Sequence, residues 1–289
     1  MKEISTRTVL LPHQHHIPRV EQFGHYRYAM AKPGLETHFH ADIIEICYCL
    51  DGVQQYIVED QRHYLKGGDI LIVPPNKAHN TGGMPEEKGE LYWIQLKLSG
   101  DGEKLCHLPQ TKSSLLLRRL EEVSNIPFKG AQQVKELLVE LFALSAHKAM
   151  DLDEIRREAL LLRLLLDTLD LSQRKLDTEV SQRVILIDDF IEKNLYRNMY
   201  VDELADLIQV STGYFKAWFK LNTGNTPKEY INRKRMEKAK EILPMESSVT
   251  EVAYALGFNS SQYFSTVFRK YTGKSPREYV QELKKERED

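Results

Sequence analysis

Two kinds of hydrophobic pattern follow one another along the chain. From residue 20 to about residue 100, apolar residues occur in short runs that are rich in β-branched and aromatic side chains. Turn-forming pairs such as Asp51-Gly52 and Gly67-Gly68 separate these runs. The strands that this pattern predicts are Ile43–Leu50, Gln54–Val58, Asp69–Val73 and Leu91–Leu98. Many short strands without helical spacing between them indicate an antiparallel sandwich or barrel.

Between residues 113 and 169 the apolar positions take the 3.6-residue spacing of helices. Two helices are predicted, Gln132–Lys148 and Leu152–Leu169. The second has one apolar face made of Ile155, Ala159, Leu162, Leu166 and Leu169 and another made of Leu161, Leu164 and Leu165. Packing on one barrel needs a single apolar face, so a partner helix from a second subunit is one interpretation, and it predicts a homodimer. Burial of both faces within one chain is the other interpretation.

A polar stretch then separates this part from a wholly helical one. Residues 171–182 offer little apolar surface for a core, which indicates an interdomain linker, and helical spacing continues from Arg183 onward. At 289 residues the chain is long enough for two domains. The predicted fold is therefore α+β. Residues 1–170 form an antiparallel β-barrel (residues 20–100) with flanking helices (residues 113–169), and residues 183–289 form an all-α domain.

The helical part contains an internal duplication. Phe215 and Phe219 recur as Phe264 and Phe268, and Pro227 recurs as Pro276. Each copy predicts two helices joined by a short turn, Val201–Ile208 with Thr212–Asn222 and Val249–Leu256 with Ser260–Tyr271; the helix Pro227–Leu243 joins the copies. Capping boxes mark the starts of three helices, at Thr226/Glu229, Ser248/Glu251 and Ser275/Glu278. The duplication thus predicts a double helix-turn-helix domain.

Charge is distributed unevenly over a chain whose net charge is only −2. Between Ser211 and Arg277 there are twelve Lys and Arg residues against five Glu, a local charge of +7 (12 − 5). A basic patch on a nearly neutral chain is typical of a surface that binds the phosphates of double-stranded DNA.

Three further features of the sequence indicate the cellular compartment of the protein. Cys47, Cys49 and Cys106 form no CxxC pair, which favours a reducing compartment over a disulfide framework. The longest apolar run, Ala159–Leu166, is interrupted by Arg163 and is far shorter than a membrane span. The first residues contain no apolar signal segment. We therefore expect a cytoplasmic protein without a membrane partner.

The duplicated segment resembles the AraC/XylS family of transcription regulators. The C-terminal signature of that family is similar to Val249–Tyr279, with Gly257-Phe258, Tyr263-Phe264 and Ser275-Pro276 in place. The N-terminal half resembles the cupin-type sensor domain of the same family. The resemblance implies a DNA-binding regulator that responds to a small-molecule effector and has RNA polymerase as a partner.

In this family the second helix of each unit enters a major groove, so the faces opposite the paired phenylalanines are the candidate DNA-reading surfaces. They present Thr212, Gly213, Lys216, Ala217 and Lys220 in the first unit and Ser261, Gln262, Ser265, Thr266 and Arg269 in the second. Gln can bond adenine bidentately, while Lys and Arg can bind guanine or phosphate. Gly213 and Ala217 replace larger family residues, which predicts weaker base reading by the first unit. For any one of these residues, a solvated helix face is the alternative.

The sensor half carries a candidate metal or effector site. The segment from Gly34 to Gly52, with His38, His40 and Glu45, resembles the first cupin motif, and Gly68-Asp69 with His79 resembles the second. Strand alternation predicts His38 and His40 on one face. Together with Glu45 and His79 they match the ligand set of cupin enzymes, which suits a divalent transition metal. Alternatively, the same residues are polar groups that contact an organic effector.

Trp93 on a later strand adds an aromatic surface on which a sugar can stack, so the predicted effector site is His38, His40, Glu45, His79 and Trp93. An ordinary core role for Trp93 is the alternative. Residues 12–18, which contain three histidines and two prolines, show little periodicity and suggest an arm that folds over the effector. We expect no catalytic residues and no required cofactor.

Three functions are compatible with these sequence features. The leading hypothesis is a sequence-specific DNA-binding regulator whose effector is a sugar or related metabolite. The second is a metal-ion-responsive regulator that uses the four cupin residues as ligands. The third is a metal-dependent cupin enzyme with a DNA-binding tail.

Overall fold

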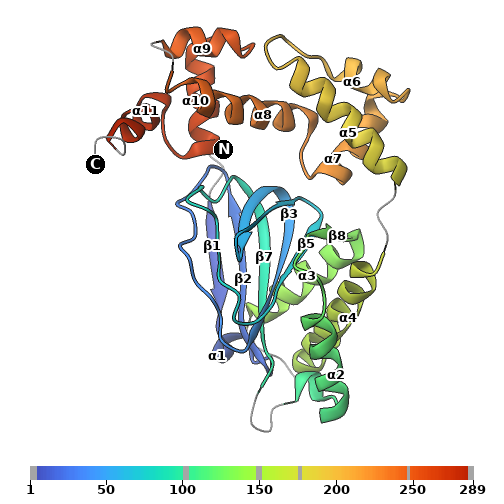
Figure 1. Cartoon of the computed structure of the whole chain (residues 1–289). Coiled ribbons are helices and arrows are strands. Elements are labelled where there is room, and N and C mark those ends of the chain that lie inside the picture. The colour runs from blue at the N-terminus through green and yellow to red at the C-terminus, as the bar shows by residue number, and fades with distance from the viewer. Residues whose placement is uncertain (1–4, 100–103, 148–151, 175–177, 246–247, 286–289) are drawn as a thin grey trace. The chain divides into compact units, whose positions relative to one another are not determined.

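The computed structural model describes residues 5–99, 104–147, 152–174, 178–245 and 248–285. The chain separates into two compact units, a first made of most residues up to 175 and a second made mainly of residues 176–289. The first unit contains the strands and the second is helical (Figure 1). This confirms the predicted α+β class with an N-terminal antiparallel sheet and a C-terminal helix-turn-helix domain.

The sheet of the first unit is antiparallel throughout. Its strands are β1 (Thr6–Leu10), β2 (Val20–Tyr28), β3 (Ile43–Val58), β4 (Gln61–Lys66), β5 (Asp69–Val73), β6 (His79–Asn80), β7 (Gly89–Lys97) and β8 (Phe128–Lys129). The strand order is β1-β2-β7-β3-β5-β8, and β4 and β6 pair with the second half of β3. Within the described residues the pairing does not close, so the unit resembles a barrel without a continuous ring of strands.

One predicted turn is wrong. Asp51-Gly52 does not separate two strands, because β3 runs through it and contains both predicted strands in one. The register against β7 shifts between Cys49 and Asp51, and Gly52 has a φ of +86°. A glycine with positive φ serves a β-bulge as well as a hairpin turn, which is why local sequence did not distinguish them. The predicted turn at Gly67-Gly68 is confirmed between β4 and β5.

The N-terminal segment is more regular than the sequence indicates. Thr6–Leu10 pairs with β2 as an edge strand, and Pro12–His15 forms the short helix α1. His15 is fully buried, and this burial lowers its pKa to about 4. Residues 6–10 and 12–15 are therefore regular and belong to the sheet and its packing, whereas the role of residues 12–18 in folding over the effector stays a prediction.

Strand alternation gives the sheet two different faces. In β3, Ile44, Ile46 and Tyr48 pack in one apolar cluster, whereas Cys47 and Cys49 belong to another. The first cluster includes the helices α2 (Gln110–Glu121), α3 (Gln132–Ser145) and α4 (Asp153–Ser172) and the 3₁₀ turn η1 (Leu105–His107). These helices cover one face of the sheet (Figure 1). The second cluster lies on the opposite, barrel-interior face.

The longest helix of the described residues, α4, buries one of its two apolar faces fully and the other only in part. Leu161, Leu164 and Leu165 are fully buried in the cluster shared with the sheet. On the other face Ile155 is 65% exposed and Leu166 is 45% exposed. Leu162 and Leu169 of that face are half-buried against the same core, so the described chain covers the second face only in part.

The boundary between the two compact units falls inside the predicted linker at 171–182, between residues 175 and 176. Helix α4 continues to Ser172, and α5 (Thr178–Lys193) begins well before residue 183. Much of the predicted linker at 171–182 is thus helical, because polar residues can extend amphipathic helices on their solvent side. Residues 175–177 lie outside the described part.

The second unit consists of two helix-turn-helix units around a joining helix. Its remaining helices are α6 (Val201–Leu207), α7 (Thr212–Thr223), α8 (Pro227–Ile242), α9 (Val249–Ala255), α10 (Ser261–Thr272) and α11 (Pro276–Lys285). The bounds of α6 to α10 agree with the predicted ones to within one residue. Phe215 and Phe219 are buried in one core, and Phe264 and Phe268 are buried in the other.

The predicted caps also form. Thr226 and Glu229 make a reciprocal capping box, and Ser275 and Glu278 exchange backbone-to-side-chain bonds of 2.6 and 3.3 Å. The Ser248 hydroxyl accepts from the backbone N–H of residue 251 at 3.3 Å. Local hydrogen bonding thus defines where α8, α9 and α11 begin.

The two helix-turn-helix units use different residues in the turn that follows the first helix. Gly257 follows α9 with a φ of +70°, and Gln209 occupies the matching position after α6 with a φ of +56°. A Cβ atom on Gly257 would lie 2.7 Å from Arg235 Nη2 and 3.1 Å from the Arg197 carbonyl oxygen. The turn after α9 therefore needs glycine, because the backbone is left-handed there and because a Cβ atom would clash with Arg235 and Arg197. The turn after α6 accepts Gln209 in a left-handed conformation because its side chain is exposed.

This difference predicts opposite effects of two substitutions. Gly257→Ala should lower the free energy of unfolding by about 2 kcal/mol or more, from a left-handed backbone and a steric clash. Gln209→Gly should raise it by up to about 1 kcal/mol, because glycine relieves the strain at that turn. Urea unfolding followed by circular dichroism measures both. Equal effects of the two changes would contradict this account of the turns.

Candidate effector chamber and DNA-reading surface

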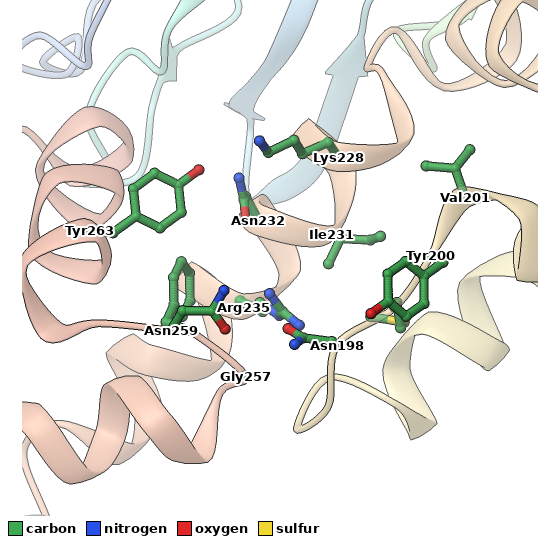
Figure 2. Close-up of a pocket in the computed structure, with 12 residues that line it drawn as sticks. Asn198, Tyr200, Val201, Lys228, Ile231, Asn232, Arg235, Gly257, Asn259 and Tyr263 are labelled. Atoms are coloured by element: carbon green, nitrogen blue, oxygen red, sulfur yellow. The ribbon is translucent and has the colours of Figure 1, made fainter.

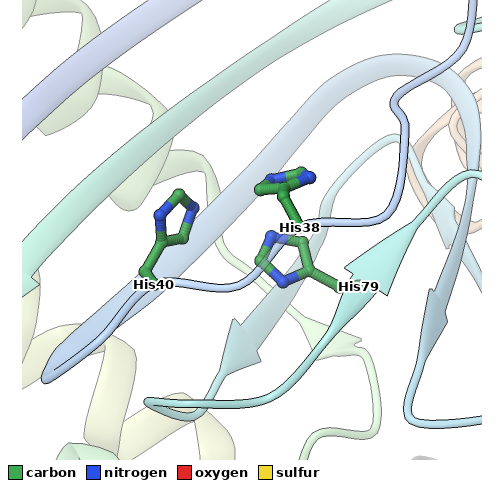
Figure 3. A group of neighbouring side chains, drawn as sticks. All are labelled: His38, His40 and His79. Atoms are coloured by element: carbon green, nitrogen blue, oxygen red, sulfur yellow. The ribbon is translucent and has the colours of Figure 1, made fainter.

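Three histidines converge at one end of the barrel-interior face. His38 and His79 are joined by two backbone hydrogen bonds of 2.8 and 3.1 Å, which place their rings 4.2 Å apart. The His40 ring lies 5.2 Å from that of His38 and 5.3 Å from that of His79. Figure 3 shows the three rings gathered in one place. His38 and His40 belong to the segment before β3 rather than to a regular strand, and the backbone bridge places His38 against His79.

A buried carboxylate completes the group. Glu45 on β3 faces Gln95 on β7, and Gln95 Nε2 donates to Glu45 Oε2 at 2.6 Å. His40 Nε2 lies 3.1 Å from Glu45 Oε2, and His79 Nε2 lies 3.8 Å from Glu45 Oε1. We call His38, His40, Glu45, His79 and Gln95 the polar chamber. Gln95 was not predicted as a site residue, although it lies two residues after Trp93 and therefore on the same strand face.

The environment keeps Glu45 ionised. Glu45 is only 6% exposed. Burial by itself would raise the pKa of its carboxyl, but the hydrogen bond from His40, the nearby His79 and the hydrogen bond from Gln95 outweigh it and lower this pKa to about 2. Burial also lowers the pKa of His79, against the opposing effect of Glu45. The chamber therefore holds a carboxylate beside a histidine that favours its neutral form.

The hydrogen bonds of two histidines define which ring nitrogen remains available. His38 Nδ1 lies 2.8 Å from the Glu36 carbonyl oxygen, and His79 Nδ1 lies 3.0 Å from that of Lys77. A carbonyl accepts only from a protonated nitrogen, so the neutral rings have their lone pairs on Nε2. The Nε2 atom of His79 is buried and has no hydrogen-bond partner among the described residues. It is therefore ready to accept a proton donor or to bind a cation.

These donors fit a transition metal in chemistry and spacing. The candidate ligand atoms of His38, His40 and His79 all lie within 4.8 Å of one another. Histidine rings whose Nδ1–H donates to a backbone carbonyl, leaving Nε2 to bind the ion, are typical ligands of Zn, Cu, Fe and Ni ions. If a metal binds, these three residues would hold it, with Glu45 as the adjoining carboxylate.

Trp93 lies beside the polar chamber, on the same face of β7 as Gln95. Its indole Nε1 donates to Gln22 Oε1 at 2.8 Å, and the Arg7 guanidinium stands 4.8 Å from the ring centroid. Trp93 is 6% exposed and packs in the apolar interior cluster. The structure thus brings four of the five predicted effector residues together and places the fifth in the adjoining core.

The predicted DNA-reading residues lie on exposed helix faces. On α7, Phe215 and Phe219 are buried while Gly213, Lys216, Ala217 and Lys220 are exposed and Thr212 is half-buried. On α10 the same pattern leaves Gln262, Thr266 and Arg269 exposed and Ser261 and Ser265 half-buried.

The hydroxyls of α10 are partly committed to the helix itself. Ser265 Oγ donates to the Ser261 carbonyl at 2.8 Å, and Thr266 Oγ1 donates to the Gln262 carbonyl at 3.0 Å. Both oxygens keep the capacity to accept a hydrogen bond. Two exposed tyrosines that were not predicted as site residues, Tyr214 and Tyr263, occupy matching positions beside these faces. The internal repeat, which aligns them, was the available signal.

Comparison with known proteins supports both halves of this description. A family model described as a helix-turn-helix domain matches residues 204–282, and one described as an AraC-like ligand binding domain matches residues 25–165. The HTH-type transcriptional activator RhaS of Shigella sonnei is 34% identical over 77% of this chain and 79% of its own length. This chain belongs to the AraC/XylS family of transcription regulators. It is thus an AraC-family DNA-binding regulator with a ligand-binding domain.

Other AraC-family relatives match over most of their lengths. The probable transcriptional regulator LumQ of Photobacterium leiognathi is 32% identical over 78% of this chain and 84% of its own length. The solved structure of ToxT from Vibrio cholerae is 15% identical, covers 90% of this chain and 97% of its own, and has a TM-score of 0.34. Within the described residues of the present chain, no helix is long and apolar enough to cross a membrane.

Proposed function

We propose that this regulator binds a small polar effector, of the sugar class, in the polar chamber, with Trp93 beside it. One observation carries the proposal. Hydrogen-bonding groups from three separated chain segments converge within an otherwise apolar interior, and the buried Nε2 of His79 has no partner among the described residues. A sugar hydroxyl can donate to this nitrogen and accept from Gln95 Nε2. An effector that binds two arrangements of the protein unequally would shift their populations and so change DNA binding.

For DNA, we propose that α7 and α10 enter successive major grooves. Thr212, Gly213, Lys216, Ala217, Lys220, Ser261, Gln262, Ser265, Thr266 and Arg269 form the reading surface. Gln262 has the longest uncharged side chain of this set and is suited to read adenine. Arg269 carries a fixed positive charge and is suited to hold phosphate.

We further propose that the chain is a homodimer joined through α4. Leu152, which precedes α4, and Ile155, Ala159 and Leu166 are exposed, and Leu162 and Leu169 are half-buried against the core. These six residues follow a 3-4-3-4-3 spacing, the a/d pattern of a coiled-coil seam. Exposed apolar residues with this spacing favour pairing with a second copy. The functional division remains residues 1–170 for effector binding and dimerisation and residues 183–289 for DNA. RNA polymerase as a partner and a cytoplasmic location are proposed from family membership.

A second candidate function is a metal-ion-responsive regulator. The close spacing of the three histidine ligand atoms favours it. In this case the effector would be a metal ion, and its ligands would be His38, His40, Glu45 and His79. The homologues are transcription regulators, and we propose no catalytic role for these residues in either case.

The two effector classes predict different results for one pair of variants. For an organic effector, the purified untagged protein should carry no stoichiometric metal. One sugar of a panel should raise its Tm by several degrees, and His79→Ala should abolish the rise. For a metal effector, elemental analysis should find about one ion per chain in the wild type and none in His38→Ala or His79→Ala. His63→Ala, on β4 outside the chamber, is the control for loss of any histidine. Retention of every response in His79→Ala would disprove both.

The DNA-reading surface predicts different effects for its two kinds of residue. Arg269→Ala should weaken binding to all duplexes and reduce the slope of log K against log salt by about 1, through loss of a phosphate contact. Gln262→Ala should relax the preference at one base pair, at a cost of about 1–3 kcal/mol for the preferred base. Fluorescence anisotropy with duplexes selected by the wild type measures both. Arg277→Ala on α11 removes the same charge elsewhere. An Arg269 variant that behaves like the Arg277 variant would place α10 outside the groove.

The α4 seam predicts a change of mass in solution. Leu166→Lys introduces a charge into the seam and should convert dimers into monomers at micromolar concentration, as measured by sedimentation equilibrium. Leu115→Lys on α2 is a matched control, because Leu115 is 47% exposed against 45% for Leu166. A wild-type chain that sediments as a monomer, or a Leu166→Lys variant that remains dimeric, refutes the seam.

A further inference from the structure

A cleft of about 350 Å³ lies between the two helix-turn-helix units. Its floor is α8, which contributes Lys228, Ile231, Asn232 and Arg235. One wall is formed by residues 198–201, at the start of α6. The other is formed by residues 257–259, which follow α9, and by Tyr263 of α10. Figure 2 shows the side chains of these three segments around a common space.

The lining of this cleft suits an anion. Of the twelve residues that line it, two are cations and none is a carboxylate. Asn198, Asn232 and Asn259 add side-chain amides, and Tyr200 and Tyr263 add hydroxyls, all of which can donate hydrogen bonds. Positive charge with several neutral donors is typical of sites that hold phosphate oxygens.

The two cations of the cleft have different roles. Arg235 is buried, and its guanidinium donates to the carbonyls of Leu195 at 3.2 Å and Arg197 at 2.7 Å while lying 5.3 Å from the Phe258 ring centroid. It therefore fastens the first helix-turn-helix unit to the second and fixes the width of the cleft. Lys228, in contrast, is exposed one turn before Asn232 on the same helix, so its ammonium is accessible to a ligand.

The position of the cleft identifies the anion. When a helix-turn-helix unit docks, the N-terminal residues of its second helix reach the bases and its first helix crosses the sugar-phosphate backbone. The start of α6, a first helix, forms one wall, and the N-terminal part of α10, a second helix, forms the other. A DNA strand that leaves the groove of one unit for that of the other passes between these two elements.

We infer that this cleft binds the phosphodiester backbone of DNA between the two grooves, with Lys228 and Asn232 as its principal donors. The inference rests on the proposed docking of α7 and α10 in successive grooves. It assigns to α8 a sequence-independent contact that strengthens specific and non-specific binding alike. Base-reading residues, in contrast, strengthen specific binding only.

The test compares two lysines of α8. Lys228→Ala should weaken binding to a wild-type-selected duplex and to an unrelated duplex by a similar factor, about fivefold at 0.15 M salt, and reduce the salt slope by about 1. Lys238→Ala is the matched control, because Lys238 lies outside the cleft and its ammonium is 2.6 Å from Glu241. The control should leave affinity and slope unchanged, and Lys228→Arg should restore both.

A modified duplex identifies the contacted phosphate. Neutral methylphosphonates placed one at a time between the two footprinted half-sites should weaken wild-type binding at one or two positions, and Lys228→Ala should abolish that sensitivity. If the wild type binds DNA but Lys228→Ala matches Lys238→Ala, the cleft assignment is wrong while the proposed function stands. If inorganic phosphate raises the Tm of the wild type but not of Lys228→Ala, and DNA affinity is equal in both, the cleft is a small-anion site and the inference is overturned. A wild type that binds no DNA contradicts the proposed function itself.

Discussion

The structure of the sensor unit depends on the two-residue alternation of strands β3 and β7. Because successive side chains point to opposite faces, each strand must supply one set of residues to the helices and another to the barrel interior. Ile46 and Ile94 pack toward the helices, whereas Cys47 and Trp93 pack inside. A shift of either strand by one residue would exchange the two sets. The bulge after Cys49 lies close to the end of the β3–β7 pairing, which stops at Gly52 and Gly89.

The same alternation explains why the polar chamber exists where it does. Glu45 and Gln95 are paired residues of β3 and β7 on the interior face, so folding of the sheet buries the Glu45 carboxylate. An isolated buried carboxylate is costly, and the donors Gln95 and His40 offset that cost. The contacts of the polar chamber thus form without an effector. An effector that replaced one of these contacts would change the interactions that join β3, β7 and the segment before β3.

The sequence predicted the DNA-binding half closely, because the features that define it are local or repeated. Capping residues such as Thr226 and Ser275 determine where helices begin, and the paired phenylalanines reveal the duplication. The fold of the sensor half, in contrast, depends on contacts between segments that lie far apart in the sequence. Nothing local shows that residues 6–10 pair with β2, or that a backbone bridge joins His38 to His79. The four cupin residues were found from a motif, whereas Gln95 became evident only from its position opposite Glu45.

A difference between the two helix-turn-helix units connects the DNA face with the cleft. In the first unit the proposed reading face has Gly213 and Ala217 where the second has Gln262 and Thr266, so it offers fewer atoms to base edges. On the proposed docking, binding of the first unit relies more on phosphate contacts, which carry no sequence information. Because Arg235 fastens the two units together, a backbone contact on α8 would hold the first unit on DNA at the position that the second unit selects. Sequence reading would then belong mainly to α10, and the first unit and α8 would supply affinity.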